Sequence, residues 1–200
     1  RLLSRGLGDV YKRQNRMSVV TENTADSSFV VGTYSERNHL SNPGRGNVWF
    51  YSVDKNGNLK WSKIFAGDNN GTSSYDEIDD IIPTSDGNFF AIGYSDNSSY
   101  STGVGAYDAI LYKIDPNGNM LWARALGTTD YDWGQCIIPT SDGNYLVGGQ
   151  YYDFSSFHIL LMKIDINGNV LWSNTYGGNG YSSLGTSHPN YGNTLSLIHI

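Results

Sequence analysis

Apolar and polar positions along the chain do not follow a helical period. Instead, runs that are nearly continuous in apolar character alternate with short polar turns. The clearest runs are FFAIGY at residues 89–94, AILYKI at 109–114, YLVGG at 145–149 and ILLMKI at 159–164. Strands with this composition are covered on both faces, so the pattern predicts sheets that pack between neighbouring sheets.

The turns between these runs repeat. IIPTSDGN occurs at residues 81–88 and again at 137–144, and ADSSFVVGTYS from Ala25 resembles a degraded third copy of SDGNFFAIGYS. A second motif, Asp-x-Asn-Gly-Asn-x-x-Trp, occupies residues 54–61, 115–122 and 165–172. Successive copies lie 50 to 61 residues apart, which indicates one folding unit of about that length used several times.

The residue types in these motifs are those that close tight hairpins. An Asp side chain can bond the backbone two residues on, Pro116 fixes φ at the second turn position, and Gly takes the left-handed conformation. We therefore expect structural turns at Asp54, Gly57, Asp86, Gly87, Asp115, Gly118, Asp142, Gly143, Asp165 and Gly168. Asp-x-Asn-Gly-Asn also resembles part of a calcium loop, but its Gly comes too early and the glutamate ligand near position 12 is missing.

Repeated four-stranded units that cover one another on both faces are typical of β-propeller blades. The sequence thus predicts an all-β fold: a β-propeller arc of about three four-stranded antiparallel blades, incomplete at both ends, with blades near residues 15–66, 67–127 and 128–180. Trp61, Trp122 and Trp172 recur in register, and we expect them to pack between blades. An isolated arc would leave two blade faces uncovered and prone to association.

The two ends of the chain carry one DNA sequence in opposite orientations. DVYKRQ at residues 9–14 can be coded GAT GTG TAT AAG AGA CAG, whose reverse complement translates as LSLIHI, the sequence of residues 195–200. This sequence resembles the mosaic end of a transposase adapter used in sequencing libraries. We expect residues 1–14 and 195–200 to be adapter-derived and residues 15–194 to be the propeller segment; the alternative is a basic targeting peptide.

Composition narrows the classes of partner. The chain has a net charge of −6, and without Arg1, Arg5, Lys12, Arg13 and Asp9 nine basic and eighteen acidic residues remain, a net of −9. This balance argues against a nucleic-acid partner. No apolar stretch approaches the roughly 20 residues of a membrane helix, so membrane insertion is not expected. A single cysteine, Cys136, excludes an internal disulfide and fits a core position.

The pattern IIPTSDGN(F/Y)…G, followed by Tyr-Lys-Ile-Asp-x-Asn-Gly-Asn-x-x-Trp, resembles β-propeller repeats of secreted and surface-exposed bacterial and archaeal proteins, in the neighbourhood of quinoprotein-like propellers. The resemblance implies an extracellular or cell-envelope location and further blades of the same propeller as partners. The quinoprotein docking motif resembles Asp-x-x-Thr-Gly-x-x-x-Trp, whereas residues 115–122 lack the Thr and are one residue shorter. A quinone cofactor is therefore not expected.

Blade geometry predicts where a ligand would bind. The tight turns emerge on one side of the blades, whereas the long, varied segments 36–47, 66–77, 96–107, 127–134, 151–157 and 177–189 emerge on the other. Binding residues concentrate on variable loops held by a rigid scaffold. We therefore take Tyr100, Tyr107, Tyr151 and Tyr152 as candidate ligand-face residues, suited to a glycan or a protein; the alternative is that these rings pack over blade edges.

Evidence for catalysis is sparse. The sequence has no Gly-x-Ser-x-Gly elbow, and its carboxylates are too numerous for a glycosidase pair to be chosen. The acidic run from Asp76 to Asp80 is either a calcium ligand set or a solvated strand edge, so no cofactor beyond calcium is considered. We expect a noncatalytic binding or scaffold segment of a larger extracellular or cell-surface β-propeller protein; the alternative is part of a secreted carbohydrate-active or quinoprotein-like enzyme with catalytic residues largely outside this chain.

Overall fold

The computed structural model describes residues 19–36, 46–65, 76–96 and 107–177, and these residues form an all-β structure without a helix. Twelve strands in this part of the chain make three four-stranded antiparallel sheets. Blade 1 contains β1 (Val19–Asn23), β2 (Ser28–Glu36), β3 (Gly46–Val53) and β4 (Leu59–Phe65). Blade 2 contains β5 (Asp76–Pro83), β6 (Phe89–Ser95), β7 (Asp108–Ile114) and β8 (Met120–Leu126). Blade 3 contains β9 (Tyr131–Pro139), β10 (Tyr145–Tyr152), β11 (Phe157–Ile164) and β12 (Val170–Tyr176).

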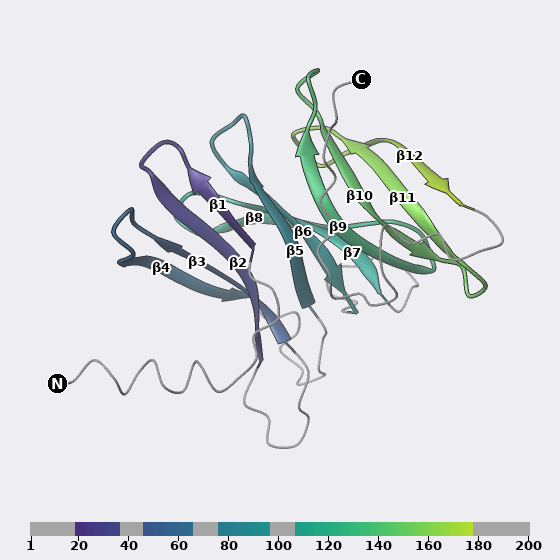
Figure 1. Ribbon diagram of the computed structural model, residues 1–200, viewed down its shortest axis with the longest axis horizontal. Helices are drawn as coiled ribbons and strands as arrows, with labels where there is room; N and C mark the ends of the chain where they lie inside the picture. Colours follow the sequence, from purple (N-terminus) through teal and green to yellow (C-terminus); the bar gives the residue numbers. More distant parts are fainter. Residues whose placement is uncertain (1–18, 37–45, 66–75, 97–106, 178–200) are drawn as a thin grey trace.

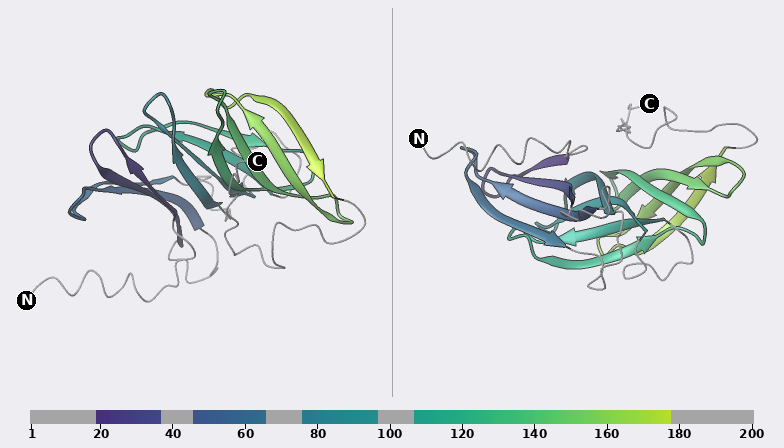
Figure 2. Two further views of the ribbon diagram at one scale, coloured as in Figure 1. Left: turned by 45° about the horizontal axis from the view of Figure 1, so that its top comes forward. Right: turned by 90° about the horizontal axis from the view of Figure 1, so that it is seen from below.

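Each blade is a meander whose strands pair in sequence order. The three sheets follow one another side by side (Figures 1 and 2), and the first strands β1, β5 and β9 contact one another in turn. The fourth strands lie farthest from these contacts. Successive four-stranded meanders with adjoining first strands are the arrangement of β-propeller blades, so the described residues form an arc of three blades and the predicted fold class is confirmed.

The middle blade explains the continuous apolar runs of the sequence. Every residue of β6 and β7 is buried. Along β6, Phe89 and Ala91 join the core shared with blade 1, whereas Phe90 and Ile92 join the core shared with blade 3. Because successive side chains of a strand point to opposite faces, a blade covered on both sides is mostly apolar along its whole strands, with buried polar residues such as Lys113 paired.

The outer blades are covered on one side only within the described residues. Burial alternates along β11, where Leu160, Met162 and Ile164 are buried and the residues between them are half-buried. All seven residues of β12 are exposed, including Val170, Leu171 and Trp172. The lateral surface of blade 3 beyond β12 is therefore open to solvent along the described chain.

The Asp-x-Asn-Gly turns share one hydrogen-bond pattern. Oδ1 of the turn Asp accepts from the backbone N–H groups two and four residues on, and Oδ2 accepts from the side-chain amide of the Asn four residues on, all at 2.8–2.9 Å. Gly57, Gly118 and Gly168 have φ of +83°, +80° and +76°. These bonds hold the turn Asp residues Asp54, Asp115 and Asp165 at identical positions in the three blades.

The Ser-Asp-Gly turns are built similarly in blades 2 and 3. Gly87 and Gly143 have φ of +81° and +80°, and Asp86 and Asp142 accept a hydrogen bond from a Thr hydroxyl two residues earlier at 2.6 Å. In blade 1 the corresponding position holds Ser27, whose φ is +56°. The degraded third copy thus keeps the left-handed conformation after losing the glycine that adopts it most readily.

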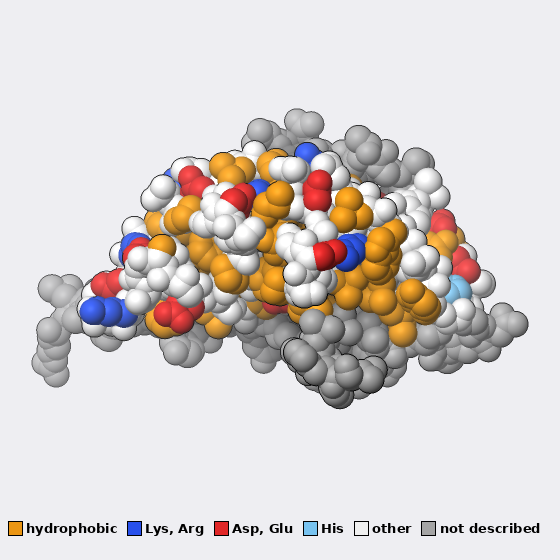
Figure 3. Space-filling view, turned by 90° about the horizontal axis from the view of Figure 1, so that it is seen from above, with side chains coloured by type: hydrophobic (Ala, Val, Ile, Leu, Met, Phe, Trp, Pro, Cys, Tyr) orange, Lys and Arg blue, Asp and Glu red, His pale blue; other side chains and the backbone are white. Residues whose placement is uncertain are grey.

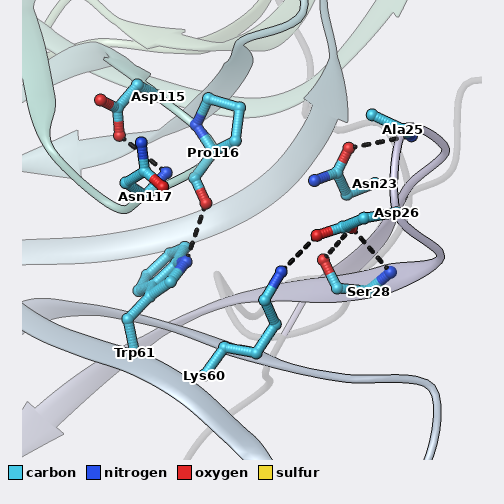
Figure 4. Close-up of polar contacts among 9 residues, drawn as sticks. All are labelled: Asn23, Ala25, Asp26, Ser28, Lys60, Trp61, Asp115, Pro116 and Asn117. Atoms are coloured by element: carbon cyan, nitrogen blue, oxygen red, sulfur yellow. Dashed lines mark hydrogen bonds and ion pairs between the residues drawn. The ribbon is translucent and has the colours of Figure 1, made fainter.

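Tryptophan side chains join one blade to the next. Nε1 of Trp61 in β4 donates to the carbonyl oxygen of Pro116 at 2.8 Å (Figure 4), and its ring covers Gly118 in the same turn of blade 2. Trp122 in β8 covers Gly168 of blade 3 in the same way. The third tryptophan of the series, Trp172, is 40% exposed. Two of the three recurring tryptophans therefore lie at a blade junction within the described residues.

The acidic run of β5 is buried or half-buried within blade 2 and is not a solvated edge. Asp76 is buried and accepts a hydrogen bond from the hydroxyl of Ser95, and Glu77 accepts one from Tyr94. A register shift between Ile78 and Asp80 marks a β-bulge, and blade 3 carries the matching shift opposite Gly148 and Gly149. Within the described residues no group of three or more His, Cys, Asp or Glu side chains is placed to hold a metal ion.

Candidate functional site

The two sides of the arc differ in what they present. The tight turns lie along the upper edge in Figure 1, and the space-filling view from above shows hydrophobic side chains there with acidic and basic ones scattered among them (Figure 3). On the opposite side lie the end of β10, the starts of β9 and β11, and the residues before β7. This second side, the variable-loop side, carries the candidate site.

Six aromatic side chains gather on the variable-loop side of blades 2 and 3. We define the aromatic cluster by these residues: Tyr107, Tyr131, Trp133, Tyr152, Phe154 and Phe157. Phe154 is exposed and the other five are half-buried. The rings therefore contact one another and still present part of their surface to solvent.

The strand pattern of blade 3 brings four of these rings together. Tyr131 and Trp133 are two residues apart on β9, so they share a face, and their rings are nearly parallel with centroids 5.9 Å apart. Tyr152 lies opposite Tyr131 in the β9–β10 register, and Phe157 lies opposite Tyr152 in the β10–β11 register. The centroids of Tyr152 and Phe157 are 4.7 Å apart, which is within the range of favourable aromatic pairs.

Tyr107 extends the cluster from blade 2. Its ring centroid lies 5.7 Å from that of Tyr131 and 6.0 Å from that of Trp133. Its carbonyl oxygen accepts a hydrogen bond from the backbone N–H of Asp132 at 2.9 Å, which fixes the segment before β7 against β9. Tyr94 packs edge-on behind it at 5.8 Å. The aromatic cluster thus crosses a blade junction and depends on the packing of both blades.

Phe154 stands at the outer end of the cluster in an unfavourable backbone conformation. Its φ is +66° and its side chain is 63% exposed, while its ring centroid lies 5.1 Å from that of Tyr131. A bulky residue at positive φ is a genuine outlier that costs of order 1–3 kcal/mol. Such strain at an exposed aromatic side chain is typical of a functional position.

The β10–β11 turn is ordered around Asp153, which holds Phe154 in place. Oδ1 of Asp153 accepts hydrogen bonds from the backbone N–H groups of Ser155 and Ser156 at 2.9 and 2.8 Å and from the Ser155 hydroxyl at 2.6 Å. These bonds, with the Ser155 hydroxyl contributing most, hold the pKa of Asp153 well below its usual range. Oδ2 lies 3.2 Å from Nε2 of His158. The turn therefore carries a fixed negative charge beside Phe154.

Tyr151 and Tyr152, predicted together as ligand-face residues, lie on opposite faces of β10. Tyr152 belongs to the aromatic cluster. Tyr151 instead donates its hydroxyl to Oδ2 of Asp130 at 2.7 Å and packs against His158, with ring centroids 5.6 Å apart. The hydrogen bond to Asp130 raises the pKa of Tyr151 to about 12. Tyr100, the fourth predicted residue, lies outside the described residues.

Sequence reasoning missed Tyr131, Trp133, Phe154 and Phe157. The spacing of Tyr131 and Trp133 places both on one face of a strand, so alternation along β9 was a usable signal. Phe154 carried no such signal, because its exposure depends on a turn conformation that Asp153 and the two serines impose. The junction with Tyr107 is a contact between blades, which no local pattern reveals.

The chain matches none of the protein families and none of the curated proteins with which it was compared. Among solved structures it is similar to the periplasmic gluconolactonase PpgL of Pseudomonas aeruginosa, with a TM-score of 0.38 and 13% sequence identity. The match covers 82% of this chain and 58% of the gluconolactonase chain. In the part of this chain that the structure describes, no helix could cross a membrane. The fold assignment to the β-propeller class comes from the three sheets themselves.

Proposed function

We propose that this chain is a noncatalytic binding segment of a larger extracellular or cell-surface β-propeller protein, and that the aromatic cluster is its ligand surface. The observation that carries the proposal is Phe154, which is exposed at positive φ beside a contiguous set of rings. Aromatic side chains that combine a rigid ring with little entropy to lose are the residues that dominate binding surfaces.

The groups around the cluster favour a glycan as the ligand. Sugars offer apolar C–H faces that stack on aromatic rings and hydroxyl groups that donate to carboxylates. Asp153 keeps a lowered pKa at one end of the cluster, and the carboxylate of Asp130 lies on the same side of blade 3. Rings for stacking and carboxylates for accepting hydrogen bonds therefore occur together on the variable-loop side.

A glycan array probed with the full chain tests this proposal, followed by titration calorimetry on the glycans that bind. Phe154→Ala and Tyr152→Ala should each raise Kd at least tenfold, which corresponds to about 1.4 kcal/mol. Leu59→Ala is the matched control, because Leu59 is 65% exposed but lies in blade 1 at the tight-turn side. Retained binding in both cluster variants, or an array without any bound glycan, would contradict the proposal.

A further inference from the structure

The junction between consecutive blades is built from the same parts twice. Trp61 of blade 1 lies against Gly118 of blade 2, and Trp122 of blade 2 lies against Gly168 of blade 3. A Cβ on Gly118 would stand 2.6 Å from the Trp61 ring, and one on Gly168 would stand 2.5 Å from the Trp122 ring. These distances are shorter than any real carbon contact, so the turn glycine is what allows the indole to approach.

Each junction also satisfies the carbonyl group at the second position of the turn. Nε1 of Trp61 donates to the carbonyl oxygen of Pro116 at 2.8 Å (Figure 4), and Nζ of Lys113 donates to that of Ile166 at 2.9 Å. In the second junction Arg124 adds a hydrogen bond to Oδ1 of Asn169 at 2.9 Å. A blade therefore supplies a tryptophan and a donor, and the next blade supplies an Asp-x-Asn-Gly turn.

Blade 3 presents the tryptophan half of this junction. Trp172 occupies the position of Trp61 and Trp122 in its strand, opposite Lys163 as Trp122 is opposite Lys113. Trp172 is 40% exposed, and Val170 and Leu171 beside it are exposed as well. Lys163 binds Asp142 as Lys113 binds Asp86, which places its ammonium group as it is placed in the second junction.

Blade 1 presents the turn half. Residues 54–58 have the same hydrogen bonds as the two occupied turns, and the φ of Gly57, +83°, is close to the +80° of Gly118. Among the described residues, nothing stands within 4 Å of the position that a Cβ on Gly57 would take. The surface that an indole covers in blades 2 and 3 is therefore open in blade 1.

We propose that Trp172 of one copy of the chain docks on the Asp54–Asn58 turn of a second copy, in the geometry that joins blade 1 to blade 2. The two halves belong to opposite ends of one arc, so the contact is head-to-tail. In a dimer, the tryptophan of each copy docks on the turn of the other copy. Both open surfaces of both copies are then occupied, and the two arcs close a ring of six blades. Rings of about 4 to 8 blades are the usual range for this fold. The proposal concerns the 200-residue chain, in which the second copy takes the place that further blades hold in the larger protein of the proposed function, and it does not depend on the ligand surface.

Sedimentation velocity and light scattering over a range of concentrations test the proposal with the full chain. We expect a dimer with twice the 22.1 kDa chain mass. Trp172→Ala removes the docking ring, and Gly57→Asn adds a side chain where the indole would lie, so each should raise the dimer dissociation constant at least tenfold.

Matched controls separate docking from changes in folding. Gly143→Asn places the same residue at φ of +80°, also with nothing within 4 Å of the Cβ position, but in a turn that no tryptophan covers. Leu121→Ala removes an apolar side chain that is 49% exposed from the outermost strand of blade 2, which belongs to neither half of the proposed contact. Both should leave the dimer intact. A monomer at every concentration, association unaffected by Trp172→Ala and Gly57→Asn, or growth into open-ended oligomers would overturn the proposal.

Discussion

Oδ2 of Asp80 in blade 2 accepts a hydrogen bond from the backbone N–H of Ile137 in blade 3 at 2.9 Å, and its Oδ1 accepts one from the N–H of Ile81 at 2.8 Å. One carboxylate thus satisfies a backbone group in each of two first strands. Burial raises the pKa of Asp80, although the two hydrogen bonds oppose that shift. The Asp80 carboxylate therefore joins blades 2 and 3 through a hydrogen bond.

Asp80→Ala should lower the free energy of unfolding by about 1–3 kcal/mol, because it leaves the N–H of Ile137 without its acceptor at the blade junction. Asp80→Asn keeps one acceptor oxygen and should cost clearly less. Chemical denaturation of the three proteins measures the difference. Equal losses in the two variants would show that the hydrogen bond to Ile137 is not the source of the stabilisation.

Trp122→Ala should destabilise the monomer by about 2–3 kcal/mol, somewhat below the 3–5 kcal/mol of a fully buried tryptophan, because Trp122 is half-buried against Gly168. Trp172→Ala should cost less than about 0.5 kcal/mol at concentrations where the chain is monomeric, because its side chain is exposed. Denaturant unfolding monitored by far-ultraviolet circular dichroism compares the two. Similar losses would contradict the difference in their surroundings.

Phe154→Gly should raise stability and weaken glycan binding at the same time. Glycine adopts a φ of +66° without steric cost, so relief of strain outweighs its greater entropy in the unfolded chain, with a net gain of about 1 kcal/mol. Loss of the exposed ring removes a stacking surface of the aromatic cluster. Thermal unfolding and calorimetry on the same preparation check both effects, and a loss of stability would refute the assignment of strain to Phe154.

The ion pair between Asp86 and Lys113 should make stability fall in acid. Burial acts to raise the pKa of Asp86, but the hydrogen bond from Lys113, 2.6 Å away, and those from Thr84 and Asn88 outweigh it and lower the pKa to about 2. A pKa below the unfolded value of about 3.9 means that the contribution is complete above pH 4 and is lost as the pH falls toward 2.

The variant Asp86→Asn isolates this contribution. At pH 6 it should be about 1 kcal/mol less stable than the original protein, a modest figure because the Asp86 side chain is 37% exposed. The difference should shrink steadily between pH 4 and pH 2. Unfolding curves of both proteins across this range provide the measurement, and a pH-independent difference would rule out the ion pair as its cause.

The blades themselves could be predicted from the sequence, because their signals are local. Continuous apolar runs gave the buried strands of blade 2, and Asp-x-Asn-Gly gave turns whose bonds lie within five residues. The turn at Ser27 was not among the predicted turns, although it lies in the degraded copy of the motif that starts at Ala25. Local chemistry determines these features regardless of what packs against them.

The rest depends on contacts between blades, which have no local signature. The bulge before Asp80 forms only when β5 pairs with β6. The hydrogen bond between Asp80 and the N–H of Ile137 is not repeated in the sequence, because blade 3 has Cys136 at the position of Asp80, and Cys136 contacts the carbonyl oxygen of Gly148. The aromatic cluster likewise needs Tyr107 and Tyr131 to meet across a junction. Sequence repeats reveal the structural residues that all blades have in common, whereas the aromatic cluster consists of residues that differ from blade to blade.

The junction made by Trp61 and Trp122 recognises a backbone shape and a missing side chain, not the identity of a partner residue. The second turn position is Pro116 in one case and Ile166 in the other, and the carbonyl oxygen of each accepts a hydrogen bond from the preceding blade. This contact tolerates different residues at the second turn position, because the indole needs only a turn glycine to approach. Successive blades can therefore diverge in sequence there while the tryptophan still fits.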